Sequence, residues 1–346
     1  MQLAEPVCRL VAYVASASLL VSGASLAASQ GAAVNLPVPT GLLPISWPAE
    51  NPYTSEKAEL GRILFFDARI SADNTVSCST CHSPQYAFTD SMPVSIGIGR
   101  QKGTRSAPTI INRAYGQPQF WDGRAPTLEQ QVKIPMTNPI EMGNTEQAIL
   151  NKLRSIPGYR VLFAKAFGSE EFTFDQVTQA VATFERTIVS GNSPYDRYQA
   201  GDKKALTPQQ VRGMNVFYKK AKCDKCHEGM NFTRNEFHNT GVGTGKPEPD
   251  LGRYSITKDP KDWAAFKTPT LRDIAETPPY MHDGSLKTLK EVVEFYDKGG
   301  ILNKNLDRDI KPLKLTVDEK ASLADFLRAL SGQGWQNIKP PEKFPE

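Results

Sequence analysis

The pattern Cys-x-x-Cys-His occurs twice in this chain, as CSTCH at residues 78–82 and as CDKCH at residues 223–227. Two thiols at this spacing reach the two vinyl groups of one haem and form thioether links to it. The histidine that follows is then held beneath the iron as its proximal ligand. The residues predicted to bind two covalent haems c are Cys78, Cys81, His82, Cys223, Cys226 and His227. A chain with this pattern has to fold around both haems.

Two other kinds of site use paired cysteines. A thioredoxin-type redox pair does not require a histidine directly after its second cysteine, whereas both copies here have one. A four-cysteine zinc ribbon has its halves ~15–20 residues apart, far closer than Cys81 and Cys223. The fifth cysteine, Cys8, lies in the leader, so no cysteine remains for a structural disulfide in the mature chain. We therefore interpret both motifs as haem sites.

Length and charge narrow the class of protein. At 346 residues the chain exceeds the usual single domain of ~100–200 residues, so two domains, one for each haem, are expected. The apolar fraction of 39% is sufficient for globular cores. The net charge of +4 is mild, and lysine and arginine are scattered along the chain, so we expect no nucleic-acid partner.

The first 28 residues contain the only long apolar stretch. Residues 10–28 carry no charge and end in small residues, which is typical of a secretory signal cleaved near Ala27 or Ala28. The alternative is a retained membrane anchor, although the stretch barely reaches the ~20 residues that a span needs. Because bacterial haem c is attached after export, we expect a periplasmic protein without stable membrane insertion once the signal is removed.

Capping residues before apolar stripes predict where helices begin. They lie at Thr54 or Ser55, Thr173, Thr207 and Thr316. The remaining segments are an extended lead-in at 29–53, a short helix from 128 broken around Pro135 and Pro139, a polar break at 191–205 and a surface loop at 239–262. No segment alternates as a strand does. We predict a mostly α fold of two cytochrome c-like haem domains, residues 54–195 and 196–346.

Five further runs resemble the bacterial di-haem cytochrome c peroxidase superfamily. They are APT at 107–109, FWDGR at 120–124, NPIEMG at 138–143, PTLR at 269–272 and PYMHDG at 279–284. With both haem motifs in the same order, the resemblance covers nearly all of the mature chain. It implies an enzyme that reacts with hydrogen peroxide at its N-terminal haem and exchanges electrons through its C-terminal haem.

Two positions resemble the MauG-like branch of that superfamily. Ordinary peroxidases close the N-terminal haem with a histidine before the APT run; here that position is Ile98, which implies a five-coordinate iron at rest. At the C-terminal haem, Tyr296 stands where ordinary peroxidases have a methionine ligand, and MauG-like enzymes use a tyrosine there. The alternative is that Tyr296 only packs against the haem, in which case Met281 or Met230 would be the sixth ligand.

The resemblance also implies roles for residues around the first haem. Glu141 would move a proton between the two oxygens of hydrogen peroxide, Gln131 and Pro135 would line the same distal pocket, and Trp121 would relay electrons between the haems. The alternatives are an ordinary surface carboxylate for Glu141 and a buried core residue for Trp121.

A bridging calcium ion is the third group implied. Thr277 and Pro279 resemble its backbone ligands, but Ser106 stands where the family usually has an asparagine, which implies a weaker site. His238 and His282 are interpreted as partners of haem propionates or of neighbouring side chains. Ala221 replaces the surface tryptophan through which holes leave MauG, so the exit route or the substrate must differ here.

Together these features predict a periplasmic di-haem oxidoreductase. It would react with hydrogen peroxide at the first haem and oxidise a donor, such as a tyrosine or tryptophan of a partner protein, through a His/Tyr second haem. One alternative is a cytochrome c peroxidase that removes hydrogen peroxide with a small redox protein as donor. A plain di-haem electron carrier is the other, and it would leave Glu141 without a role.

Overall fold

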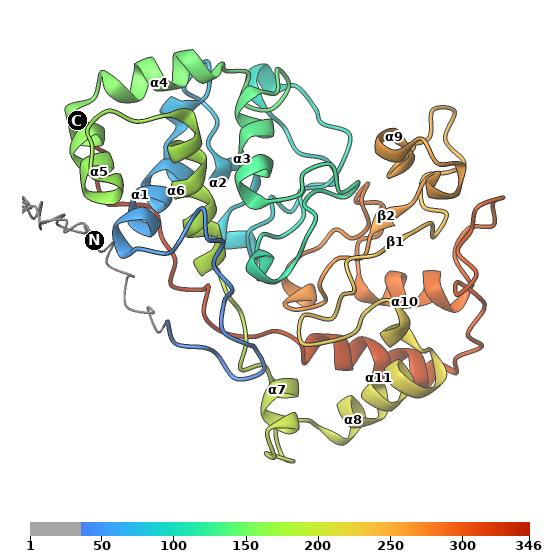
Figure 1. The fold of residues 1–346 in the computed structure, drawn as a ribbon. Helices are drawn as coiled ribbons and strands as arrows, with labels where there is room; N and C mark the ends of the chain where they lie inside the picture. The colour runs from blue at the N-terminus through green and yellow to red at the C-terminus, as the bar shows by residue number, and fades with distance from the viewer. Residues whose placement is uncertain (1–35) are drawn as a thin grey trace, which may run out of the picture. The chain divides into compact units, whose positions relative to one another are not determined.

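The predicted capping residues begin helices in the computed structural model, which describes residues 36–346 (Figure 1). Thr54 accepts a hydrogen bond from the backbone of Lys57 and begins α1 (Ser55–Phe66). Reciprocal capping boxes begin three further helices. These helices are α6 (Phe174–Thr187), α8 (Pro208–Asn215) and α11 (Val317–Arg328). Local sequence therefore sets the starts of the main core helices.

The N-terminal half is built on the crossing of α1 and α6. A Cβ on Gly61 would lie 1.9 Å from the carbonyl oxygen of Ala180, so only glycine permits this close approach. The buried side chains around the crossing include Leu64, Phe65 and Val181. The other helices of this half are α2 (Cys78–Cys81), α3 (Leu128–Thr137), α4 (Glu146–Arg154) and α5 (Pro157–Phe167). The next helix, α7 (Pro194–Gln199), packs against the C-terminal half through Tyr195.

The C-terminal half repeats this construction with α8 and α11. A Cβ on Gly213 would again lie 1.9 Å from a carbonyl oxygen, that of Ser322. A second apolar cluster, which includes Phe217 and Phe326, surrounds this crossing. This half also contains α9 (Tyr254–Thr257) and α10 (Leu289–Asp297). Within residues 36–346 the only sheet pairs β1 (Phe237–His238) antiparallel to β2 (Phe266–Lys267), which confirms the mostly α prediction.

The duplication extends to the loops between the cores. Phe120 and Met281 have the positive φ angles 67° and 74° at matching places, each before an Asp-Gly turn. Threonines then begin α3 and α10 in the same register. The two loops also bond across to each other: the amide of Ser106 donates to the carbonyl of His282, and that of Lys267 to the carbonyl of Trp121, both at 2.8 Å. The halves therefore meet in a two-fold-like exchange of backbone hydrogen bonds.

Two local predictions were wrong. Pro135 does not end its helix; it lies inside α3, which continues to Thr137 because later amides, such as that of Asn138 to Ile134 at 2.9 Å, still find their carbonyls. The segment 191–205 is not only a polar break, since Ser193 and Pro194 begin α7 there. In both places the residue type misled because tertiary contacts and capping outweighed it. Helices α4 and α5 were not predicted from the sequence.

The signal peptide assigned to residues 1–28 lies outside the described residues, as does the start of the lead-in. No helix within residues 36–346 has both the length and the apolar character that a membrane crossing requires.

Candidate functional site

One cavity of about 900 Å³ runs between the two Cys-x-x-Cys-His motifs. Both motifs line it, and so do the other residues expected to bind a cofactor or take part in the reaction, apart from the alternative ligand Met230. These further residues are Ser106, Trp121, Gln131, Pro135, Glu141, Thr277, Pro279 and Tyr296. Segments from both halves of the chain thus converge on a single space.

The two motif histidines are oriented in the same way. Nδ1 of His82 lies 3.1 Å from the carbonyl oxygen of Phe88, and Nδ1 of His227 lies 2.9 Å from that of Phe232. A ring whose Nδ1–H donates to a carbonyl keeps the lone pair of Nε2 for a metal. Burial lowers the pKa of both rings, to about 4 for His227, which favours the neutral form that binds iron.

Threonines hold these carbonyl-bearing loops in place. Thr109 Oγ1 donates to the carbonyl of Ala87, next to Phe88, and Thr270 Oγ1 donates to that of Asn231, next to Phe232, both at 2.7 Å. Each threonine follows a proline in a run that the sequence analysis singled out. The APT and PTLR runs therefore act at the histidines from a distance along the chain.

Buried charges in the cavity wall fit a carboxylate-bearing cofactor. Arg113 and Lys267 both line the cavity and are almost fully buried, and neither forms an ion pair with any described residue. Burial lowers the pKa of Arg113 to about 10 and that of Lys267 well below its ordinary value. Unpaired buried cations are costly, so these positions call for an anion. The propionates of two haems would supply one, and with the free thiols of both motifs the cavity fits two haem groups.

Glu141 is held in a turn at the end of α3. Its amide donates to the carbonyl of Asn138 at 3.1 Å, and its Oε1 accepts from Asn138 Nδ2 at 2.8 Å. Burial raises the pKa of Glu141, while the guanidinium of Arg124 and the amide of Asn138 oppose the rise. The carboxyl is therefore fixed in the cavity wall with a proton affinity above that of a surface glutamate.

The loop that carries Ile98 packs against this turn. The amide of Ile98 donates to the carbonyl of Glu141 at 2.9 Å, and the end of its side chain would lie 2.1 Å from a Cβ on Gly143. Gly97 lines the cavity, but Ile98 does not. Ile98 therefore offers no side-chain ligand for an iron at the first motif. Its backbone amide holds the carbonyl of Glu141 instead.

The internal repeat distinguishes the two ends of the cavity. Leu128 begins α3 and Leu289 begins α10, and Pro135 and Tyr296 then occupy the same place along these two helices. Pro135 has no atom that can bind iron, whereas Tyr296 has a phenol oxygen. The half-buried Tyr296 faces the cavity, and burial raises its pKa. Only the second end thus has a side chain at this position that could close the iron.

Trp121 lies where the two halves exchange hydrogen bonds. Its indole Nε1 donates to the carbonyl of Ser106 at 2.9 Å, and its own carbonyl accepts from Lys267. His282, its counterpart in the repeat, stacks on Phe266 with ring centres 3.6 Å apart. His238 binds Asp307 through Nδ1 at 2.7 Å. Trp121 is thus fixed within the wall that both motifs share.

The two methionines considered as alternative ligands differ. The sulfur of Met230 accepts a hydrogen bond from the amide of Leu43 at 3.3 Å, and Met230 does not line the cavity. Met281 does line it. Met230 is therefore poorly placed to replace Tyr296.

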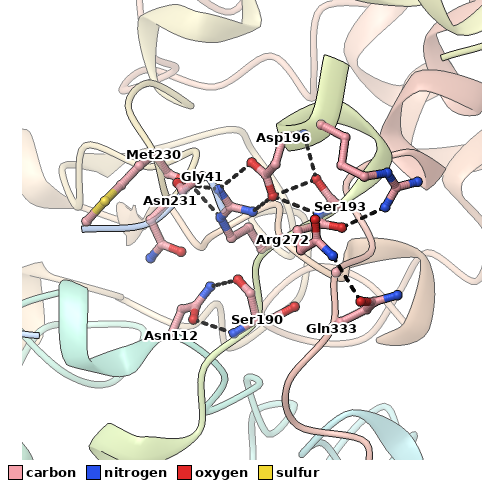
Figure 2. A network of polar contacts seen from close by, with 12 residues as sticks. Gly41, Asn112, Ser190, Ser193, Asp196, Met230, Asn231, Arg272 and Gln333 are labelled. Atoms are coloured by element: carbon pink, nitrogen blue, oxygen red, sulfur yellow. Dashed lines mark hydrogen bonds and ion pairs between the residues drawn. The ribbon is translucent and has the colours of Figure 1, made fainter. Parts of the chain in front are cut away.

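A buried ion pair that the sequence analysis missed supports the second motif (Figure 2). Arg272 and Asp196 form two hydrogen bonds, of 2.8 and 3.0 Å, with side chains only 1% and 2% exposed. Arg272 also donates to the carbonyls of Met230 at 2.7 Å and of Gly41 at 3.0 Å. The pair therefore ties the lead-in and α7 to the loop that carries Phe232. Arg272 ends the PTLR run, which was the available signal.

The three carbonyls proposed as calcium ligands differ in whether they already accept a hydrogen bond. The carbonyls of Thr277 and Pro279 accept no backbone hydrogen bond from any described residue, whereas that of Ser106 accepts from Trp121. The hydroxyl of Ser106 makes one long bond, 3.5 Å to the carbonyl of Met92. Residues 36–346 contain no cluster of three or more His, Cys, Asp or Glu side chains suited to a metal ion. Any cation here would depend on carbonyls and water.

Comparison with known proteins gives a consistent picture. A family profile described as di-haem cytochrome c peroxidase matches residues 55–204. The chain is 41% identical to the methylamine utilization protein MauG of Methylorubrum extorquens, over 83% of this chain and 81% of the relative. It is 38% identical to the cytochrome c551 peroxidase of Nitrosomonas europaea, over 86% and 85%. A crystal structure of a MauG-like protein associated with microbial copper homeostasis superposes with a TM-score of 0.82 and 35% identity, over 89% and 99% of the two chains.

Proposed function

Because this chain belongs to the di-haem cytochrome c peroxidase family, we propose that it is a periplasmic peroxidase of the MauG-like kind, which reacts with hydrogen peroxide at the His82 haem and oxidises a protein donor through the His227 haem. The observation that carries this proposal is the difference between Pro135 and Tyr296 at equivalent places in one cavity. An open first iron and a closed second iron divide the work between substrate binding and electron transfer.

The haems would supply the redox chemistry, and the chain's own residues would move the peroxide proton and relay electrons between the haems. Glu141 accepts a proton from the near oxygen of hydrogen peroxide and returns it to the far oxygen, so that the far oxygen leaves as water. Asn138 keeps the carboxyl in place for both transfers. Gln131 and Pro135 line the cavity beside it.

Two residues would link the first haem to the donor. Tyr296 would bind the second iron as a phenolate, a hard anionic ligand that favours higher oxidation states. Trp121 lies in the wall shared by both halves and would relay electrons between them. The fixed indole hydrogen bond keeps its ring in one orientation.

A peroxide-removing cytochrome c peroxidase with a small redox protein as donor is the second candidate. The 38% identity to the Nitrosomonas europaea cytochrome c551 peroxidase favours it. The two candidates share the peroxide chemistry and differ in the donor and in the ligand of the second haem.

Electron paramagnetic resonance of the ferric holoprotein distinguishes them. We expect one high-spin and one low-spin haem, whose ferric signals decline together when one equivalent of hydrogen peroxide is added. In Tyr296→Phe the low-spin signal should disappear, because a phenyl ring offers the iron no oxygen. The control is Tyr280→Phe, another cavity-lining tyrosine of the same half. A low-spin signal that persists in Tyr296→Phe rules out the tyrosine ligand, and two low-spin haems that react only after half-reduction identify the ordinary peroxidase.

Calcium between the halves is a further part of the proposal, supported by the free carbonyls of Thr277 and Pro279. A ligand present at about 100 times its Kd stabilises the folded state by about 2.7 kcal/mol. We therefore expect a chelator to lower the Tm of the holoprotein and added calcium to restore it. Ser106→Asn should bind calcium more tightly than the wild type, because an amide oxygen replaces a hydroxyl. If neither the chelator nor added calcium changes the Tm, the proposed calcium site is wrong.

A further inference from the structure

Four exposed lysines line the cavity, and all of them belong to its second end. Lys220, Lys222 and Lys225 surround the second motif in sequence, and Lys311 comes from the segment after α10. The ion pair between Lys225 and Asp309 joins these two segments. We call these four side chains the lysine rim. Among the described residues, no exposed lysine or arginine lines the first end of the cavity, where the half-buried Arg105 and Arg124 form ion pairs with Asp122 and Asp250.

The lysine rim carries more positive charge than its neighbours neutralise. Asp309 pairs with Lys225, and Glu319 pairs with Lys220 at 2.6 Å. Lys222 and Lys311 form no ion pair with any described residue, and Lys219, also exposed, adds a further charge beside them. The half-buried Asp224 is the remaining acidic side chain within the motif. Exposed, unpaired charges of one sign at the mouth of a cavity steer a partner of opposite sign.

The rim surrounds a small residue. Ala221 lies between Lys220 and Lys222, is half-buried and lines the cavity next to Cys223. A methyl side chain covers little of the space behind it. A partner seated on the lysines would therefore meet no aromatic side chain at this position, two residues before the cysteine that would hold the second haem.

We propose that the lysine rim docks an acidic surface patch of the protein that exchanges electrons with the second haem. The proposal rests on the proposed function for the existence of that exchange and adds the chemistry by which the partner is recognised. Association driven by such complementarity is faster at low salt and slows as salt screens it.

The test compares two reduced c-type cytochromes of similar potential, one acidic and one basic, as donors to the holoprotein with hydrogen peroxide. We expect the acidic donor to be oxidised at least ~10-fold faster at low salt, with this advantage lost at high salt. Lys222→Glu/Lys311→Glu should lower the rate with the acidic donor by about 10-fold or more and leave oxidation of a neutral phenol unchanged. Neither lysine has an ion-pair partner, so the reversal breaks no such contact.

The matched control is Lys152→Glu/Lys165→Glu, the same change of charge at exposed, unpaired lysines on α4 and α5. Binding of the ferric cytochromes without peroxide, measured by surface plasmon resonance, separates docking from turnover. Equal binding of both cytochromes, or equal weakening by both double variants, overturns the docking surface. If the acidic cytochrome binds at the rim but the wild type oxidises neither donor nor phenol, the docking surface stands and the peroxidase proposal fails.

Discussion

Glu141→Gln is expected to slow peroxide cleavage by about 10²–10⁴-fold, the usual contribution of a positioned general acid–base group. Glutamine has nearly the same shape and can still accept the 2.8 Å hydrogen bond from Asn138 through its amide oxygen. It cannot take up and return a proton. Both haems should stay attached, because the thioether links come from the motif cysteines, which this substitution leaves in place. Stopped-flow mixing of the ferric holoprotein with hydrogen peroxide measures the rate.

The pH dependence gives a second readout of the same role. A glutamate that must first accept a proton works only as carboxylate, so the wild-type rate should fall as the pH drops through its pKa. Burial raises that pKa above the ordinary glutamate range. The acid limb should therefore lie above the range of a surface glutamate, and it should be missing in Glu141→Gln.

Glu185→Gln is the matched control. Glu185 lines the same cavity, and burial raises its pKa to about 8, so the side chain is mostly uncharged at neutral pH. An amide there replaces one neutral group by another, and its Oε2 has no hydrogen-bond partner among the described residues to lose. We expect a near wild-type rate. Equal losses in both variants, or none in Glu141→Gln, would contradict a specific proton-transfer role for Glu141.

Local rules of sequence were sufficient for the starts of the main core helices and for the two haem motifs. A capping box is formed by residues three apart, as at Thr316 and Glu319, so no tertiary information is needed to find it. The haem motifs are equally local. The resemblance then supplied residues such as Tyr296, and the fold does bring them to one space.

Contacts between segments far apart in the chain could not be predicted from local sequence. Asp196 lies in a segment that the sequence indicates only as a polar break, yet its side chain is buried against Arg272. Ile98 was singled out because ordinary peroxidases have a histidine at this position. Its packing against Gly143 could not be predicted from the sequence. The exchange of hydrogen bonds between Ser106, Lys267 and their partners also depends on how the halves meet. These features are set by tertiary packing, which composition and periodicity do not encode.

Arg272→Met is expected to destabilise the holoprotein by about 3–5 kcal/mol, since it leaves Asp196 as a buried charge without a partner. At about 2–4 °C per kcal/mol, the fall in Tm should be roughly 6–20 °C. Thermal unfolding followed by circular dichroism measures it. Arg62→Met is the control, because its pair with Glu59 is exposed and such pairs contribute only about 0–1 kcal/mol.

The double variant Arg272→Met/Asp196→Asn separates the unpaired charge from the loss of packing. Asparagine removes the charge, and its amide oxygen can still accept the 2.9 Å hydrogen bond from the amide of Ser193. The double variant should therefore recover part of the stability lost in Arg272→Met. If it is no more stable than Arg272→Met, packing of the arginine rather than pairing of the charge accounts for the loss.

The same variant tests whether Arg272 acts on the second haem from a distance. Its Nε donates to the carbonyl of Met230, in the loop whose Phe232 carbonyl orients His227. Loosening that loop should shift the low-spin ferric signal of the second haem and leave the high-spin signal of the first unchanged, because His82 depends on a separate carbonyl, that of Phe88. A general loss of structure would alter both signals. Arg272 is a positioning residue only if the change is confined to the second haem and Asp196→Asn alone, which keeps the bond to Met230, leaves that signal intact.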